Sequence, residues 1–113
     1  MRLSVSLGIV TVSLALTGCY PKSAAAPGPL ANETLEIAKM RWADSSPDAL
    51  EQGRQIYVKS CGECHGHPDV VAYPEDKWPG AAKRMGDKAS LKPADTELMT
   101  RFVLAYRASL TKP

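Results

Sequence analysis

The five residues from Cys61 to His65 constrain this chain more than any other part of its sequence. They are Cys61-Gly62-Glu63-Cys64-His65, so two residues separate a pair of cysteines and a histidine follows at once. On one helical turn, this spacing lets both thiols add to neighbouring vinyl groups of a single haem and form thioethers. The next imidazole then faces the iron. The motif predicts one covalently bound haem c, with Cys61 and Cys64 as its attachment points and His65 as an axial ligand.

Two other uses of a Cys-x-x-Cys pair fit this sequence less well. A thioredoxin-like redox pair belongs in a βαβ context, and no such pattern surrounds Cys61. A structural zinc site needs a second pair of ligands at suitable spacing, and none is present in the sequence.

The N-terminus has the pattern of an export signal. Met1-Arg2 is positively charged, and the uncharged apolar stretch from Leu3 to Leu16 has the length of a signal-peptide core rather than of a membrane span. It ends Leu16-Thr17-Gly18-Cys19, which resembles the bacterial lipoprotein box. The resemblance implies a signal peptide over 1–18 and a lipid on Cys19, and several acyl chains would anchor the chain stably. The alternative is an ordinary secretory signal with an incidental cysteine.

This signal predicts a location on the periplasmic side of a bacterial membrane, with Tyr20 after the cysteine slightly favouring the outer membrane. The chain has three cysteines, so none remains for a disulfide once Cys19 carries lipid and the other two carry haem.

Length and charge limit the rest of the chain. It has 113 residues, a formal net charge of +2 and no long basic run, which argues against nucleic-acid binding. Residues 19–45 are expected to be the lipid anchor and a flexible linker, rich in Pro, Ala and Gly up to about Ala31, with a possible short helix over Asn32–Trp42. The domain is expected over 46–113, where so small a core usually needs a cofactor.

Helix signals in this domain predict an all-α fold. Ser46-Pro47-Asp48 starts a helix expected to end near Ser60, and Pro93 starts another that runs towards the C-terminus. Between them, a helical piece is expected from Pro74 to Met85, with Gly86-Asp87 as its stop. Gly53 is costly inside a helix, so a close helix crossing is expected there.

With these residues placed, the chain from about Ser46 to Leu110 resembles a small class I monohaem cytochrome c. In that fold the N- and C-terminal helices cross around one covalently bound haem. Gly53 and Tyr57 match the glycine and aromatic of the first helix, and Val103 and Tyr106 match the facing residues of the last.

The resemblance implies a methionine as the second axial ligand. Met85 lies twenty residues after His65 and ends a Trp78-Pro79…Met85 arrangement typical of small cytochromes of this kind. The alternative is a gap-filling core methionine. Met40 precedes the expected domain and Met99 fits core packing. His67 is interpreted as a surface-loop histidine, and Pro68 and Pro74 both remain candidates for the carbonyl that accepts a bond from His65.

The resemblance further implies electron transfer by a non-enzymatic, membrane-tethered carrier that cycles between Fe(II) and Fe(III) with His/Met ligation. Its partners would be redox proteins, and the basic residues around Met85 could steer an acidic docking surface towards it. These residues are Lys83, Arg84, Lys88 and Lys92. A solvated helix face is an equally good interpretation of this cluster. The alternative functions are a haem sensor or small-ligand binder with an open or weak sixth site, and an accessory subunit of a larger oxidoreductase.

Overall fold

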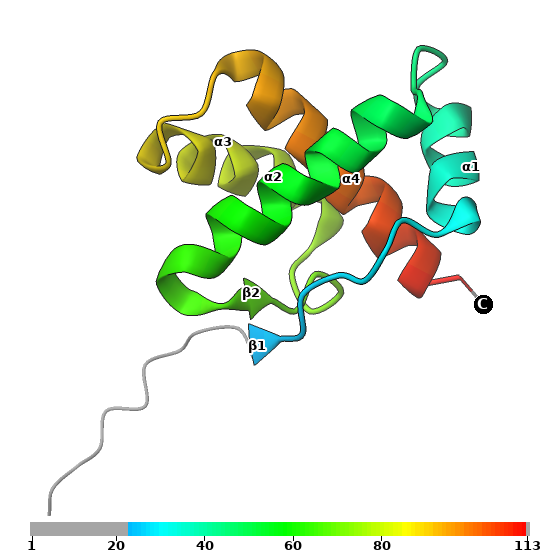
Figure 1. Ribbon diagram of the computed structural model, residues 1–113. Helices are drawn as coiled ribbons and strands as arrows, with labels where there is room; N and C mark the ends of the chain where they lie inside the picture. The colour runs from blue at the N-terminus through cyan, green and yellow to red at the C-terminus, as the bar shows by residue number, and fades with distance from the viewer. Residues whose placement is uncertain (1–22, 113) are drawn as a thin grey trace, which may run out of the picture.

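The computed structural model describes residues 23–112, without the side chains of residues 23, 24 and 61–65. The signal peptide and lipidated cysteine expected at 1–18 and Cys19 lie outside these residues. The helices are α1 (Asn32–Arg41), α2 (Pro47–His65), the short 3-10 helix η1 (Glu75–Lys77), α3 (Trp78–Lys88) and α4 (Pro93–Leu110). Two short strands, β1 (Ser23–Ala24) and β2 (His67–Pro68), complete the described elements. The described chain is therefore mostly helical, as expected (Figure 1).

Helix α4 is the centre of the fold, because α1, α2 and α3 all pack against it. Its middle is buried on several sides, from Phe102 through Ala105. A single apolar stripe does not describe α4, because Val103 and Leu104 are buried as well, whereas Leu110 is about half exposed. A helix covered by three neighbours needs apolar residues around most of its circumference rather than on one face.

The packed unit begins before residue 46. Thr34, Ile37 and Ala38 of α1 are buried, and the Thr34 hydroxyl donates to the Ser109 hydroxyl near the end of α4 at 3.3 Å. The short helix expected here is present, and it contributes to the core. The domain boundary expected at residue 46 therefore falls inside the set of packed helices.

Residues 23–31 form an N-terminal strap along the domain, where the composition predicts a flexible linker. β1 pairs with β2 in an antiparallel register that joins Ala24 to His67, and Pro27 is buried. Arg54 of α2 donates to the carbonyls of Pro27 and Gly28 at 3.5 and 3.4 Å. Linker composition missed these contacts because they satisfy backbone groups and need no large apolar side chain.

Helix α2 starts as expected but ends later. The Ser46 hydroxyl accepts a hydrogen bond from the Ala49 amide at 3.1 Å, and Pro47 occupies the first turn. The helix continues past Ser60 to His65 and stops at Gly66, whose φ of 73° is in the glycine-favouring region. The cysteine motif is thus the end of α2 rather than the start of a loop.

Helix α3 also extends beyond the end predicted at Gly86-Asp87. Gly86 lies within it, and the chain leaves the helix at Ser90, whose φ is 56°. The Leu91 amide donates to the Gly86 carbonyl at 2.9 Å and the Ser90 amide donates to the Asp87 carbonyl at 3.2 Å. These two bonds are those of a Schellman motif, with serine where glycine is usual.

Candidate functional site

The cysteine motif forms the last turn of α2. The backbone is helical there, so positions 61, 64 and 65 fall on one face, at spacings of three and four residues. One turn earlier, Tyr57 is fully buried, with its ring 6.0 Å from Phe102 of α4 and 5.2 Å from His67. The turn that carries the motif is therefore attached to the core through Tyr57.

A close helix crossing holds α2 on α4, as expected from Gly53. A Cβ on Gly53 would collide with the Leu98 carbonyl oxygen and come within 2.7 Å of its carbon and 3.2 Å of the Phe102 Cβ. The residue that faces Tyr57 across this crossing is Phe102, whereas the family resemblance placed Val103 and Tyr106 opposite. Tyr106 instead stacks on Phe102, with ring centroids 5.6 Å apart.

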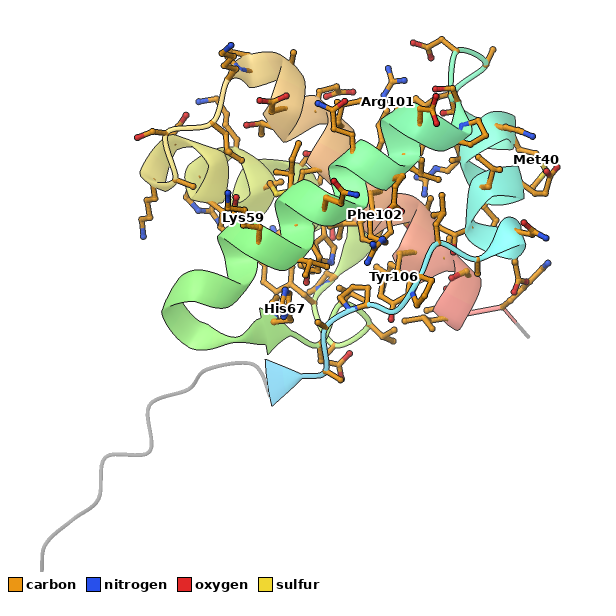
Figure 2. The ribbon with its side chains drawn as sticks, viewed as in Figure 1. Met40, Lys59, His67, Arg101, Phe102 and Tyr106 are labelled. Atoms are coloured by element: carbon orange, nitrogen blue, oxygen red, sulfur yellow. The ribbon has the colours of Figure 1, made fainter. Side chains whose placement is uncertain are left out.

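A cavity of about 460 Å³ opens between α2 and the connection from α3 to α4. Ile56, Ala89 and Leu91 give it apolar walls, and Lys59 and Ser60 stand on the α2 side. Ser60 directly precedes Cys61, so the cavity adjoins the cysteine turn. Figure 2 shows Lys59 on the stretch of α2 that passes α3. Gln52 and Gln55 also line the cavity, so its wall combines apolar and polar side chains.

Met85 lies on α3, three residues before the helix ends. It is half-buried and packs against the core, at the edge of the buried stripe formed by Trp78, Ala82 and Gly86. The other two methionines of the described chain differ from it: Met40 is 79% exposed and Met99 is 1% exposed within the core. Met99 is thus a core residue, as expected. Met85 therefore lies on a helix with its side chain partly accessible to solvent. Its assignment as an axial ligand stays a prediction.

His67 is buried, and its interpretation as a surface-loop histidine is wrong. It is 9% exposed, and its Nε2 donates to the Val58 carbonyl of α2 at 3.1 Å. The strap pairs with β2 at this point, which explains the burial. Figure 2 shows His67 on β2, below α2. Its hydrogen bond ties the segment after the motif to the helix that carries it.

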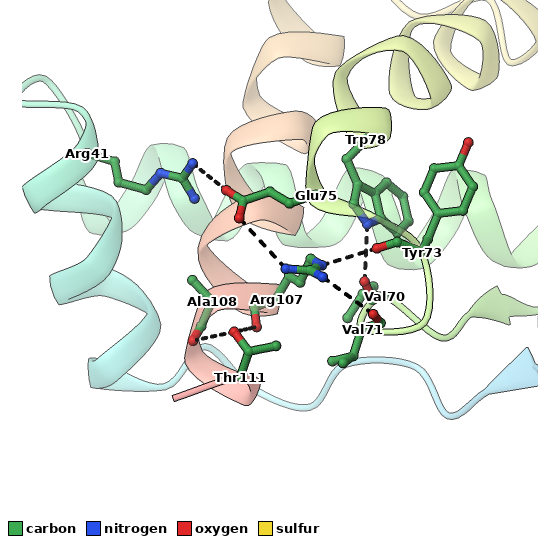
Figure 3. Close-up of polar contacts among 9 residues, drawn as sticks. All are labelled: Arg41, Val70, Val71, Tyr73, Glu75, Trp78, Arg107, Ala108 and Thr111. Carbon is green, nitrogen blue, oxygen red and sulfur yellow. Dashed lines mark hydrogen bonds and ion pairs between the residues drawn. The ribbon is translucent and has the colours of Figure 1, made fainter. Parts of the chain in front are cut away.

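The loop between the motif and α3 is held by several donors (Figure 3). Trp78 Nε1 donates to the Val70 carbonyl at 3.1 Å, and its ring meets Tyr73 edge-on with centroids 5.4 Å apart. Arg107 of α4 donates to the carbonyls of Tyr73 and Val71 at 3.2 and 3.4 Å. Helix α3 is therefore hydrogen-bonded to this loop through Trp78, and its buried residues pack against α4.

Exposed cations, most of them without ion pairs, gather in a region that we call the cysteine end. It comprises the last turns of α2, all of α3 and the α3–α4 connection. Its exposed cations are Lys59, Lys83, Arg84, Lys88 and Lys92. Within the described part of the chain, the one ion pair among them is Lys83 with Asp87, at 3.5 Å and largely exposed. The arrangement leaves a net positive surface beside Met85.

The opposite, ion-paired end consists of α1, Glu75 of η1, the first turns of α2 and the parts of α4 that contact them. Glu75 contacts both Arg41 and Arg107, at 2.7 and 3.7 Å (Figure 3). The remaining pairs are Glu51–Arg54, Asp44–Arg101, Glu97–Arg101, Glu36–Lys39 and Glu33–Lys112.

Two carboxyl groups of this end titrate below their usual range. A hydrogen bond from Arg101 lowers the pKa of Asp44, and one from Arg54 lowers the pKa of Glu51. Trp42 lies here too, half-buried, with the guanidinium groups of Arg41 and Arg101 over its ring at 5.2 and 5.5 Å. Its ring packs against the buried core.

Sequence reasoning missed Thr96, which lies against Gly86, and the cavity wall at Ala89 and Leu91. The one sequence feature that could have pointed to Thr96 is Gly86, the second glycine in an otherwise continuous helical pattern. From the sequence alone, Gly86 is interpreted as a helix stop. In the part of the chain that the structure describes, no three His, Cys, Asp or Glu residues cluster as a metal site. None of the described helices is both long and apolar enough to cross a bilayer.

No protein-family model, curated protein or solved structure matches this chain.

Proposed function

We propose that this chain is a membrane-tethered c-type cytochrome that carries single electrons. Cys61 and Cys64 would hold one haem c through thioethers, and His65 and Met85 would be its axial ligands. The observation that carries the proposal is the Cys-x-x-Cys-His motif itself, at the end of a helix that borders a cavity. The cytochrome-like crossing at Gly53 supports a class I fold.

The residues around the motif fit such a group. Ile56 and Leu91 offer apolar contact, and Met85 offers a thioether from a different helix than the cysteines. A haem iron with both axial positions filled exchanges electrons without binding substrate, and a methionine ligand raises its potential. The chain's own part would be to fix the two ligand helices on α4 and to shield the group from water with Ile56 and Leu91.

The cations of the cysteine end support an acidic redox partner. Lys88 and Lys92 flank the α3–α4 connection, and neither has an ion pair in the described chain. Unpaired surface charge attracts an oppositely charged protein and orients it before contact. Electron exchange with such a partner should slow as salt is added.

The strap supports a short tether. If Cys19 carries the lipid, its Cα lies at most about 14 Å from that of Ser23, since each extended residue spans about 3.5 Å. From β1 onward the strap is attached to the domain through β2 and Arg54. We therefore propose that the β1–β2 edge stays near the bilayer, on the periplasmic side. A membrane-extracted protein that carries no lipid mass would contradict this part of the proposal.

The test of the proposed function is visible spectroscopy on protein matured with haem. The ferric form should show the weak far-red band of methionine ligation, and Met85→Ala should abolish it. Met40→Ala is the matched control, because Met40 is exposed on α1, at the ion-paired end of the molecule. Replacing both Cys61 and Cys64 with Ser should remove the covalently attached haem.

Two results would contradict parts of the proposal. A band that survives in Met85→Ala would refute the axial assignment. A native protein with high-spin ferric haem would favour a sensor or ligand-binding protein instead.

A further inference from the structure

Helix α4 holds both proposed ligand helices within a single turn. Gly53 of α2 lies against Leu98, and Gly86 of α3 lies against Thr96, two residues earlier on α4. One short stretch of α4 therefore sets the position of the helix with the cysteine motif and of the helix with Met85. The first contact is the expected crossing, and the second was not expected.

Gly86 is required by space rather than by backbone conformation. It lies inside α3 and is buried. A Cβ there would collide with Thr96 Oγ1 and come within 3.1 Å of Thr96 Cγ2 and 3.3 Å of Thr96 Cβ. Threonine is stiff about χ1, so its side chain cannot simply swing away. A side chain at position 86 would push α3 away from α4.

Gly80 provides the contrast on the same helix. The nearest atom to a Cβ at this position is Arg84 Nη1, at 3.5 Å, which is the free end of a long exposed side chain. Alanine fits there. Alanine also favours a helix over glycine, so both substitutions should help α3 unless the contact with α4 intervenes.

We propose that the Gly86–Thr96 contact is a positioning device for Met85. This inference rests on the proposed function, in which the Met85 sulfur ligates the iron. Met85 directly precedes Gly86, so a displacement of α3 at this point moves the ligand with it. Gly86 and Thr96 are positioning residues: they act on the haem site through the placement of α3 and contact no reacting atom in this role.

The contact predicts a size-compensation experiment. In haem-loaded protein, Gly86→Ala should at least halve the far-red band and lower the midpoint potential, with the haem still covalently bound. Thr96→Ala alone should leave both unchanged. The double variant Gly86→Ala/Thr96→Ala should restore them, because it removes Oγ1 and Cγ2 and leaves the two Cβ atoms at a tight but tolerable 3.3 Å. Gly80→Ala is the control and should match the parent protein.

The possible results distinguish a failure of this inference from a failure of the proposed function. An unchanged band in Gly86→Ala, with the band lost in Met85→Ala, overturns the positioning role alone. A Gly86→Ala defect that Thr96→Ala does not repair also overturns it, because the defect then has another cause. A band unchanged in both Met85→Ala and Gly86→Ala overturns the ligation and the inference together. If Gly86→Ala does not accumulate, Gly86→Ser in the Thr96→Ala background, measured against Thr96→Ala, gives the same comparison and should weaken the band.

Discussion

The ion-paired end and the cysteine end differ in how many of their charged side chains form ion pairs within the protein. At the ion-paired end, Arg41, Arg101 and Arg107 each contact a carboxylate, and α1 closes over α4 with buried Thr34 and Ile37. At the cysteine end, a cavity separates α2 from the α3–α4 connection and the surrounding lysines are mostly unpaired. The charged side chains of one end therefore mostly contact each other, whereas those of the other end remain available to an outside partner.

The two glycine contacts connect these ends. At Gly53 the obstacle to a side chain is the backbone of Leu98, whereas at Gly86 it is the side chain of Thr96. Backbone cannot be trimmed by substitution, but a side chain can. The Gly53 crossing should therefore be the more rigid constraint on the fold, and the Gly86 contact the more adjustable one.

The largest effect is expected from Gly53→Ala. The added methyl group must displace α2 from the Leu98 carbonyl, and overpacking of this kind should lower the free energy of unfolding by about 3 kcal/mol. Urea unfolding measures this directly. Gly80→Ala, in contrast, should change it by anything from zero to a gain of about 1 kcal/mol. Equal stabilities for Gly53→Ala and the parent protein would refute the crossing as the joint between the two ends.

The sequence predicts those parts of the fold that depend on local chemistry. Ser46 and Pro47 start α2 because a hydroxyl caps the first turn and proline suits it, and Pro93 starts α4 without a side-chain cap. Gly53 was recognised as a crossing because its position in mid-helix left no local reason for a glycine.

The parts that were missed depend on contacts distant in sequence. Gly86 resembled a stop because it stands near a helix end, and only Thr96 on another helix reveals its role. His67 is buried because the strap, more than forty residues earlier, pairs with β2. Of the candidate site, the motif could be found from spacing alone. The joining of Met85 to that motif remains a prediction, because it depends on how α2 and α3 sit on α4.

At the cysteine end, Ser90→Gly should have a smaller effect than Gly53→Ala, and it should increase stability rather than decrease it. Ser90 ends α3 with φ at 56°, a conformation that glycine adopts without strain. The substitution should raise the free energy of unfolding by about 0.5–1 kcal/mol, after allowing for the greater freedom of glycine in the unfolded chain. The neighbouring Ala89→Gly is the control, since φ there is −86° and glycine offers no relief. If both variants lose stability equally in urea titrations, Ser90 is not strained.

Neutralising lysines at the two ends should change the rate of electron exchange by different amounts. Lys88→Gln/Lys92→Gln and Lys39→Gln/Lys112→Gln remove the same net charge, but the second pair lies at the ion-paired end. With ferricyanide as oxidant of the reduced haem protein, the first variant should react about threefold more slowly, because an anion loses its attraction to the proposed electron-exchange edge. At about 0.1 M ionic strength the second should slow much less, since a charge farther than about 10 Å is then screened.

Stopped-flow measurements across a salt series test this difference, and the curves should converge at high ionic strength. Hexaammineruthenium(III), a cation, should show the opposite order. Identical slowing by both double variants would mean that net charge alone governs the reaction and that the cysteine end has no special role.

The smallest effect is expected at the ion-paired end, from Asp44→Asn. Arg101 lowers the pKa of Asp44 in the folded protein, so the ionised carboxylate favours folding at any pH above the ordinary value of 3.8. This contribution should disappear as the pH falls through the lower, folded-state pKa. The parent protein should therefore exceed Asp44→Asn slightly in stability from neutral pH down to about pH 4, and the two should converge below that.

Thermal unfolding at several pH values measures the gap between them. Added salt should shrink it, because the pair is exposed. Asp87→Asn, which breaks the looser, largely exposed pair with Lys83 at the cysteine end, is the control variant. A gap for Asp44→Asn that widened towards low pH would have the wrong sign for a carboxylate stabilised by Arg101, and the ion-paired end would then owe its order to packing alone.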